Sequence, residues 1–224
     1  MAWRLDDADL TAGQRRLLLA VARSPLRETF YLTGGSNLAG FRFRHRRSDD
    51  LDLFTDDEVP LAEILALLRG VPDATVEGPT RRYDRYGFQV RLADELVRLE
   101  FVRYPFPALG ARDVTVEGLQ LDDPADIAAN KILALLDRRE GKDLVDLWKL
   151  TQDRGVHGLQ TAVSDAERKF GVQGLRHGMQ AALLAAANAT APRLHDPRDF
   201  ESARAWARDA VRALADRSLD EDSA

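Results

Sequence analysis

The chain has 224 residues, of which 45% are hydrophobic and 31% charged, and its formal net charge is −5 at pH 7. This length supports one or two domains, and the charge argues against a protein that coats nucleic acid through its overall field, although a local basic groove stays open. The absence of cysteine excludes disulfides and thiolate metal sites. Because the sequence shows no signal peptide and no apolar run long enough to span a membrane, we expect a cytoplasmic protein with no membrane partner.

The first half of the chain mixes predicted helices and strands. Apolar residues at helical spacing predict helices at residues 11–24 and 61–70. Alternating or continuous apolar runs predict five strands, at residues 29–35, 50–54, 74–78, 86–93 and 96–104.

The composition changes near residue 120, and the second half is predicted to be helical. Asp123 and Pro124 begin a helix over residues 125–140, which Gly141 ends. Further amphipathic segments predict helices at residues 142–150, 159–171, 176–190 and 200–214. We therefore expect an α+β chain, with a mixed-sheet domain at residues 1–120 and a helical bundle domain at residues 121–224.

Residues 31–54, YLTGGSNLAGFRFRHRRSDDLDLF, concentrate glycines, arginines and aspartates. Asp50 and Asp52 alternate with two leucines, so both carboxylates are expected on one face of a strand. Such neighbouring acids repel unless a cation neutralises them, and Mg²⁺, or Mn²⁺ in its place, prefers carboxylate oxygens. These ions bind nucleotide phosphates in enzymes of phosphoryl or nucleotidyl transfer. The alternative is that Asp50 and Asp52 are ordinary exposed acids.

Gly34, Gly35 and Ser36 precede the acids. The glycines permit close backbone approach and positive φ, and Ser36 can cap a helix whose free amides face an anion such as a triphosphate. No Gly-Lys-Ser/Thr follows, so this is not a Walker loop. The alternative is that the glycines merely make a turn.

Four blocks in order resemble a known family: GGSNLA, HRRSDDLDLF, NKILALLDRRE and KDLVDLWKL. The first two look like the signature of the polymerase-β-like nucleotidyltransferase superfamily, in which Gly-Gly-Ser precedes Asp-x-Asp. Together the four resemble the AbiEii/AbiGii toxin family, over about Tyr31 to Leu150. The resemblance implies a minimal polymerase-β-like nucleotidyltransferase domain with a helical domain behind it.

The same resemblance implies the toxin of a type IV-like toxin–antitoxin or phage-defence system, with a cognate antitoxin. Relatives transfer nucleotides from an NTP, some of them to the 3′ end of tRNA, so NTP and a tRNA or other RNA acceptor are the expected partners. Two alternatives stay open. The chain could modify a protein or an aminoglycoside-like small molecule, or it could be a catalytically inactive binding module.

The family's motif positions imply roles for single residues. Asp50 and Asp52 would be catalytic metal ligands, and Gly34, Gly35 and Ser36 would bind the triphosphate. Glu100 is the candidate third carboxylate, as a metal ligand or as the base that accepts the proton of the acceptor hydroxyl. The superfamily more commonly has aspartate there, and Glu100 could equally be a solvated ion pair.

In the helical domain, the family's lysine falls on Lys131, which would be catalytic and bind the triphosphate. Its later catalytic aspartate falls on Asp146, and Asp143 competes for that role because it lies three residues earlier on the same helical face. The alternatives are a surface lysine and acids that support a helix N-terminus.

Arginines between the glycines and the acids suggest an RNA contact. Arg44, Arg46 and Arg47, together with Arg42, could neutralise RNA phosphates. The alternative is internal ion pairing. Further arginines could extend this track, namely Arg81, Arg82, Arg85, Arg138 and Arg139. Ser48 precedes Asp50 by two residues, so its phosphorylation would place about −2 charge beside the acids and block metal or NTP; a tightly binding antitoxin is the simpler alternative.

Overall fold

The computed structural model describes residues 2–221, with side chains through Leu214. Residues up to Pro107 and Ala111–Asp123 form the first compact unit, and Ala108–Gly110 with the residues from Pro124 onward form the second. No helix in the described part of the chain is long and apolar enough to cross a membrane.

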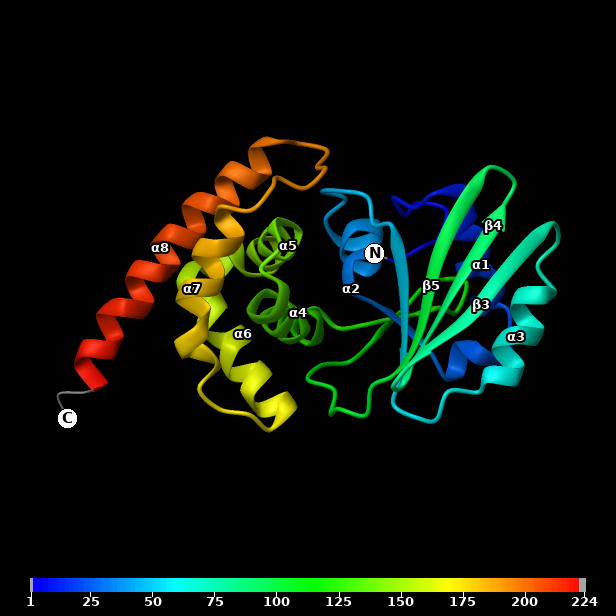
Figure 1. Cartoon of the computed structure of the whole chain (residues 1–224), viewed down its shortest axis with the longest axis horizontal. Helices are drawn as coiled ribbons and strands as arrows, with labels where there is room; N and C mark the ends of the chain where they lie inside the picture. The colour runs from blue at the N-terminus through cyan, green and yellow to red at the C-terminus, as the bar shows by residue number, and fades with distance from the viewer. Residues whose placement is uncertain (1, 222–224) are drawn as a thin grey trace. The chain divides into compact units, whose positions relative to one another are not determined.

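A mixed sheet forms the first unit (Figure 1). Its strands are β1 (Tyr31–Thr33), β2 (Asp50–Thr55), β3 (Ala74–Arg82), β4 (Arg85–Leu92), β5 (Glu95–Arg103), β6 (Asp113–Val114) and β7 (Gln120–Leu121). They are ordered β3-β4-β5-β2-β1-β7-β6. The β2/β5 and β1/β7 pairs are parallel and the other pairs are antiparallel.

The helices of the first unit are α1 (Ala12–Ala22), α2 (Gly34–Asn37) and α3 (Leu61–Arg69), with a 3-10 turn at Pro25–Glu28 and a π-helical segment at Leu38–Arg42. Thr11 caps α1 through a capping box with Gln14. Leucines of α1 and α3 pack into one apolar core with the buried residues of β2, β4 and β5. One face of these strands is therefore covered by the core.

The second unit is helical, as expected. Its helices are α4 (Pro124–Arg138), α5 (Gly141–Thr151), α6 (Gly155–Phe170), α7 (Leu175–Ala187) and α8 (Arg198–Glu221), with a 3-10 turn at Gln152–Arg154. Their apolar stripes build a separate core that includes Ile132, Leu144 and Trp206. Together with the mixed sheet, these helices confirm the predicted α+β class.

The prediction for Gly141 is wrong. α4 ends at Arg138, followed by Arg139 in the left-handed region at φ 56°, and Gly141 is the first residue of α5. A Cβ on Gly141 would lie 2.9 Å from the Thr190 carbonyl oxygen. The glycine is therefore needed for close packing and not for ending a helix.

Candidate active site

Asp50 and Asp52 share the face of β2 that lies opposite the core. Leu51 and Leu53 are fully buried, whereas both aspartates are half-buried. The strict alternation in the sequence produces this arrangement, because successive side chains of a strand point to opposite faces.

Pairing with β5 adds two charged residues to that face. In the parallel β2/β5 register, Asp50 lies beside Arg98 and Asp52 lies beside Glu100. Residues directly paired in this way project from the same side of the sheet. The structure therefore brings the three predicted carboxylates onto neighbouring strands of one face.

Arginines already neutralise two of these acids. The Arg98 Nε lies 2.6 Å from Asp50 Oδ1, and Arg85 donates to Glu100 from β4. Within the part of the chain that the structure describes, no three His, Cys, Asp or Glu side chains are grouped so that they could hold a metal ion. The three predicted carboxylates therefore share one face of the sheet but are not grouped as a metal site, and arginines hold Asp50 and Glu100 in ion pairs.

The glycine turn lies directly against Asp52. Gly34 follows β1 with φ +64°, and a Cβ built on it would be 2.6 Å from Asp52 Oδ2. Thr33, the last residue of β1, is the register partner of Asp52 in the antiparallel β1/β2 pair. Only glycine leaves room there for the carboxylate.

The next glycine faces the loop that leads into β2. A Cβ on Gly35 would lie 2.5 Å from Arg46 Nη2 and 3.0 Å from Ser48 Oγ. The Ser48 hydroxyl donates to the Asp50 carbonyl at 3.2 Å. Ser48 therefore lies next to the glycine turn and precedes the strand, so it is not on the strand face that carries Asp50 and Asp52.

Replacing Gly34 by alanine is expected to lower both stability and activity. Forcing a Cβ into the left-handed region costs about 1–2 kcal/mol, and the new methyl group would push Asp52 out of position. We expect at least a tenfold loss of nucleotide transfer, measured with thermal unfolding in parallel. Gly118→Ala is the matched control, because Gly118 also has positive φ, +93°, but its Cβ would meet nothing closer than 3.6 Å. Equal activity losses in both variants would contradict the steric explanation.

A polar network fixes the turn to β7. Thr33 Oγ1 donates to Asp122 Oδ2 at 2.6 Å, and Asn37 Nδ2 donates to the Asp122 carbonyl at 3.1 Å. Arg42 donates to the same carbonyl at 2.8 Å and to Asn37 Oδ1 at 3.1 Å. Arg42 is therefore a structural residue of the turn, which takes it out of the predicted phosphate-binding set.

Ser36 does not cap the helix as predicted. Thr33 occupies the N-cap position, and α2 begins at Gly34. Ser36 is fully buried, and its hydroxyl donates to the Thr33 carbonyl at 3.3 Å. A serine inside the first turn bonds backward to the chain, which is the common fate of a hydroxyl within a helix.

The three arginines of the loop before β2 differ in exposure. Arg44 and Arg47 are exposed, and Arg44 Nη2 donates to the Asp7 carbonyl at 2.5 Å. Arg46 is only 6% exposed and donates to the Arg47 carbonyl at 3.0 Å. Arg46 therefore belongs to the wall around the glycine turn, whereas the other two face solvent.

Lys131, Asp143 and Asp146 form a buried charged cluster within the second unit. The Lys131 ammonium lies 2.8 Å from Asp143 Oδ1 and 2.6 Å from Asp146 Oδ2, and neither carboxylate is exposed. Arg138 donates two further hydrogen bonds to Asp143. The structure thus brings Lys131 into contact with both Asp143 and Asp146. It does not decide which of the two aspartates is the predicted catalytic one.

Charge pairing controls the ionisation of this cluster. Burial by itself would raise the pKa of Asp143, but the Lys131 charge and the hydrogen bonds from Arg138 and Lys131 outweigh it. The pKa of Asp143 therefore lies below its ordinary value, and the carboxylate stays charged at neutral pH.

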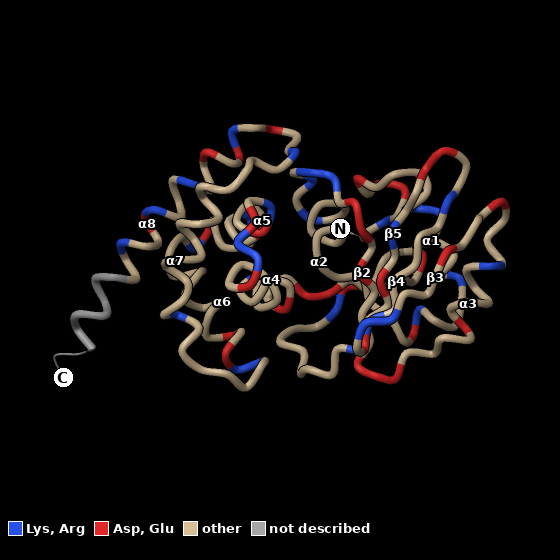
Figure 2. The backbone as a smooth tube through the Cα atoms, viewed as in Figure 1, with Lys and Arg blue, Asp and Glu red and all other residues tan. Residues whose placement is uncertain are grey.

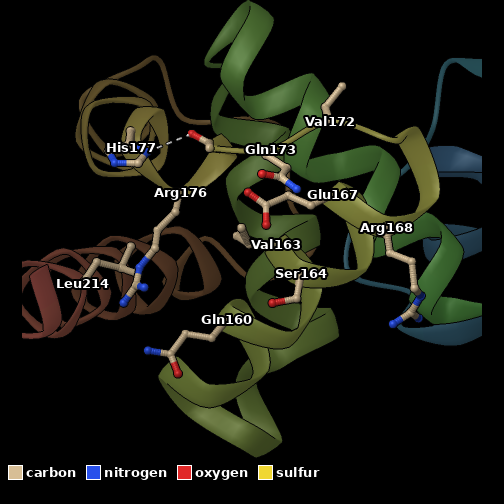
Figure 3. Close-up of a pocket in the computed structure, with 11 residues that line it drawn as sticks. Gln160, Val163, Ser164, Glu167, Arg168, Val172, Gln173, Arg176, His177 and Leu214 are labelled. Carbon is tan, nitrogen blue, oxygen red and sulfur yellow. Dashed lines mark hydrogen bonds between the residues drawn. The ribbon is translucent and has the colours of Figure 1, made fainter. Parts of the chain in front are cut away.

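A separate pocket of about 530 Å³ lies in the second unit (Figure 3). It is bounded by α6, α7 and Leu214 of α8, with Arg168, Arg176 and His177 among its polar residues. None of the residues predicted to be catalytic lines it, so the pocket is not the predicted site.

Solved structures of other proteins share this fold. MenT4, a nucleotidyltransferase toxin from Mycobacterium tuberculosis H37Rv, matches with a TM-score of 0.55 and 18% identity over 91% of this chain and 82% of that chain. A proposed nucleotidyltransferase from Helicobacter pylori matches with a TM-score of 0.50 and 15% identity over 90% of this chain and 93% of that chain. These similarities show the fold.

The family model that matches the chain places this fold, with its Asp-x-Asp strand beside a glycine turn, in the nucleotidyltransferase class of enzymes. The chain belongs to the family described as "Nucleotidyl transferase AbiEii toxin, Type IV TA system", whose model matches residues 16–224. It is also 28% identical over 153 residues to the uncharacterized protein aq_aa25 of Aquifex aeolicus strain VF5, over 65% of this chain and 69% of that protein. The predicted family, fold and enzyme class are thereby confirmed.

Proposed function

We propose that this nucleotidyltransferase uses a divalent metal to transfer nucleotides from an NTP to an RNA acceptor such as the 3′ end of tRNA. In this proposal it acts as the toxin of a type IV-like toxin–antitoxin or phage-defence system, under the control of a cognate antitoxin. The observation that carries the proposal is the contact between Gly34 and the Asp52 carboxylate. This contact joins the two halves of the signature, the glycine turn and the acidic strand.

The residues of β2 fit a divalent cation. Mg²⁺ is typically bound through one or two carboxylates together with waters and substrate phosphates, and Asp50 and Asp52 supply two carboxylates on one strand face. We propose that these two residues hold Mg²⁺ or Mn²⁺, while the assignment of Glu100 as a third ligand or as the base stays a prediction. When bound, the metal neutralises phosphate charge and stabilises the attacking and leaving oxygens.

The remaining roles belong to the chain itself. Gly34 and Gly35 would let the backbone approach the triphosphate closely, with Arg46 behind Gly35 as a buried positive charge. When a metal neutralises Asp50, the Arg98 guanidinium would leave this carboxylate and contact solvent or a phosphate group instead. An exposed ion pair of this kind is weak. The proposed catalytic roles of Lys131 and Asp146 rest on their motif positions.

Incorporation of label tests the acceptor. The protein is incubated with radiolabelled NTPs, Mg²⁺ and total tRNA, and the products are separated into RNA, protein and low-mass fractions. Lengthened, labelled tRNA is the expected result. Label in protein or in a small molecule would instead favour the two other transferase activities, and no label in any fraction under any NTP would favour an inactive binding module.

Toxicity tests the biological role. Expression of the wild-type chain in a bacterial host is expected to arrest growth, and coexpression with the antitoxin encoded beside it is expected to restore growth. A host that grows equally well with and without the chain would contradict the toxin role. The labelling experiment is independent of this outcome.

Ser48 offers a route to regulation that we carry forward as a prediction. Its hydroxyl lies against Gly35, so a phosphoryl group there would add about −2 charge where the triphosphate is expected to bind. We expect Ser48→Glu to lower nucleotide transfer by about a hundredfold and to weaken NTP binding, because like charges repel in a partly desolvated site. Ser48→Ala, which adds no charge, should retain most of the activity. Equal activities of the two variants, or an unmodified mass for a fully neutralised toxin, would contradict this mode of control.

A further inference from the structure

One face of β3 and β4 is open to solvent. We call it the outer face and define it by six side chains that are all exposed: Thr75, Glu77, Thr80, Arg82, Gln89 and Arg91. The opposite face of the same strands contributes Val76, Phe88 and Val90 to the core around α1 and α3. The outer face is therefore the side of this sheet that the core leaves uncovered.

The strand register makes the outer face continuous with the active site. Direct partners across strands share a face, which defines rows of side chains running from β2 outward. The first row is Asp50, Arg98, Gln89 and Glu77, and the second is Asp52, Glu100, Gly87 and Thr80. In the second row, Gly87 has no side chain, while Arg85 of the same face of β4 reaches across to Glu100. The rows therefore place the outer face and the carboxylates on one side of the sheet.

The charge of the outer face is positive. The side chains of Arg82 and Arg91 make no ion pair or hydrogen bond with the side chains that the structure describes, through Leu214, and Glu77 is the acid among the six side chains. Towards β2, Arg85 and Arg98 add two guanidinium groups, although these are held by Glu100 and Asp50. Figure 2 marks the Lys and Arg positions in blue and the Asp and Glu positions in red along β2, β4 and β5. Unpaired arginines on the same side of the sheet as a site for nucleotide chemistry are suited to phosphate groups.

The composition of the outer face distinguishes the kind of partner. Protein interfaces depend on buried aromatic or aliphatic anchors at their centre. The six side chains that define the outer face are threonine, glutamate, glutamine or arginine, and the apolar side chain beside them on the same side of the sheet is Leu96 of β5, the partner of Arg91. Nucleic-acid interfaces are instead more polar and more positively charged.

We propose that the outer face is the surface on which the RNA acceptor lies, with Arg82 and Arg91 binding its phosphates and Arg81 playing no part. The proposal rests on the proposed RNA acceptor and adds the place where that acceptor binds. Arg82 pairs with Arg85 on the outer face, whereas Arg81 pairs with Tyr86 and points to the other side of β3, with its guanidinium 5.4 Å from the Tyr86 ring centre.

Neighbouring charge reversals provide a matched test. Arg82→Glu, Arg91→Glu and the control Arg81→Glu each change an exposed arginine of this sheet by the same charge, and Arg81 and Arg82 are adjacent on one strand. Binding of a short fluorescein-labelled RNA is measured by anisotropy without NTP, over a range of salt concentrations. Thermal unfolding of each variant checks that the fold is intact.

We expect Arg82→Glu and Arg91→Glu each to weaken RNA binding about tenfold and to reduce the salt slope of binding by about one. Arg81→Glu should change binding less than about threefold, since its charge lies on the other side of the strand. Glu77→Gln should tighten binding about twofold because it removes a repulsive charge. Equal losses at Arg81 and Arg82, or RNA binding that none of the reversals weakens, would overturn the proposal.

The same variants separate this proposal from the proposed function. If wild-type protein transfers label to RNA and Arg82→Glu and Arg91→Glu leave the KM for RNA unchanged, the acceptor surface is wrong and the transferase activity stands. If wild-type protein transfers no label to RNA, the proposed acceptor is wrong, whatever the binding experiment shows.

Discussion

Replacing Asp52 by asparagine is expected to abolish nucleotide transfer while leaving the fold intact. The substitution keeps the shape of the side chain but removes the charge that faces Gly34 and the proposed metal. Loss of one charged ligand costs several kcal/mol of transition-state stabilisation, which corresponds to a rate loss of at least about 10³-fold. The measurement is the initial rate of label incorporation from NTP, with binding of Mn²⁺ followed separately by its paramagnetic resonance signal.

The control for this change is Asp57→Asn, which alters an exposed acid just beyond the end of β2. Both substitutions remove one negative charge from the same segment, so a general electrostatic effect would lower both rates. We expect the control to retain nearly full activity. Comparable activity of Asp52→Asn and Asp57→Asn would contradict the assignment of Asp52 as a metal ligand.

Replacing Asp143 by asparagine is expected to destabilise the second unit strongly. Asp143 is fully buried and contacts the Lys131 ammonium at 2.8 Å and the Arg138 Nε at 2.6 Å. Removing one partner of a buried ion pair leaves an incompletely compensated charge, at a cost of about 3–5 kcal/mol. Asp146 still contacts Lys131, so we expect the lower end of this range. Urea unfolding is followed by tryptophan fluorescence, to which Trp148 and Trp206 of this unit contribute together with Trp3 of the first unit.

Asp137→Asn is the matched control for the buried cluster. Asp137 is an exposed acid of α4, beside Arg138 in the sequence, and its substitution removes the same charge from the surface. Surface substitutions of this kind usually change stability by less than about 0.5 kcal/mol. Similar unfolding midpoints for the two variants would contradict the argument from burial.

The buried cluster of Lys131, Asp143 and Asp146 also predicts how the stability of the protein depends on pH. The pKa of Asp143 is lower in the folded protein than its ordinary value of 3.8, so the folded state binds this proton more weakly than the unfolded state does. Its stabilising contribution is therefore complete above about pH 4 and is lost as the pH falls through the folded-state pKa. Unfolding free energies measured between neutral pH and pH 3 should fall less steeply in Asp143→Asn than in the wild type.

Local patterns were sufficient to predict much of the first unit. The alternation around Leu51 and Leu53 correctly assigned one face to Asp50 and Asp52, because a period of two residues is a property of the strand alone. The change in composition near residue 120 likewise separated sheet from helices. The two-residue strands β6 and β7 were missed because such short segments have no period to detect.

Tertiary partners could not be predicted in the same way. Nothing in the sequence near Arg42 indicates that its guanidinium reaches the Asp122 carbonyl, 80 residues away. The pairing of Glu100 with Arg85 depends on the β4/β5 register, and the burial of Arg46 depends on the path of the loop before β2. Roles that depend on long-range contacts therefore needed the structure.

The hydrogen bonds between the glycine turn and Asp122, directly after β7, limit where the chain can be truncated at its C-terminal side. A fragment ending at Val114 would retain Gly34, Asp52 and Glu100, yet it would lack Asp122, whose oxygen atoms accept hydrogen bonds from Thr33, Asn37 and Arg42. It would also leave β1 as an unpaired sheet edge. Any attempt to isolate the first unit must therefore cut the chain beyond the last short strand.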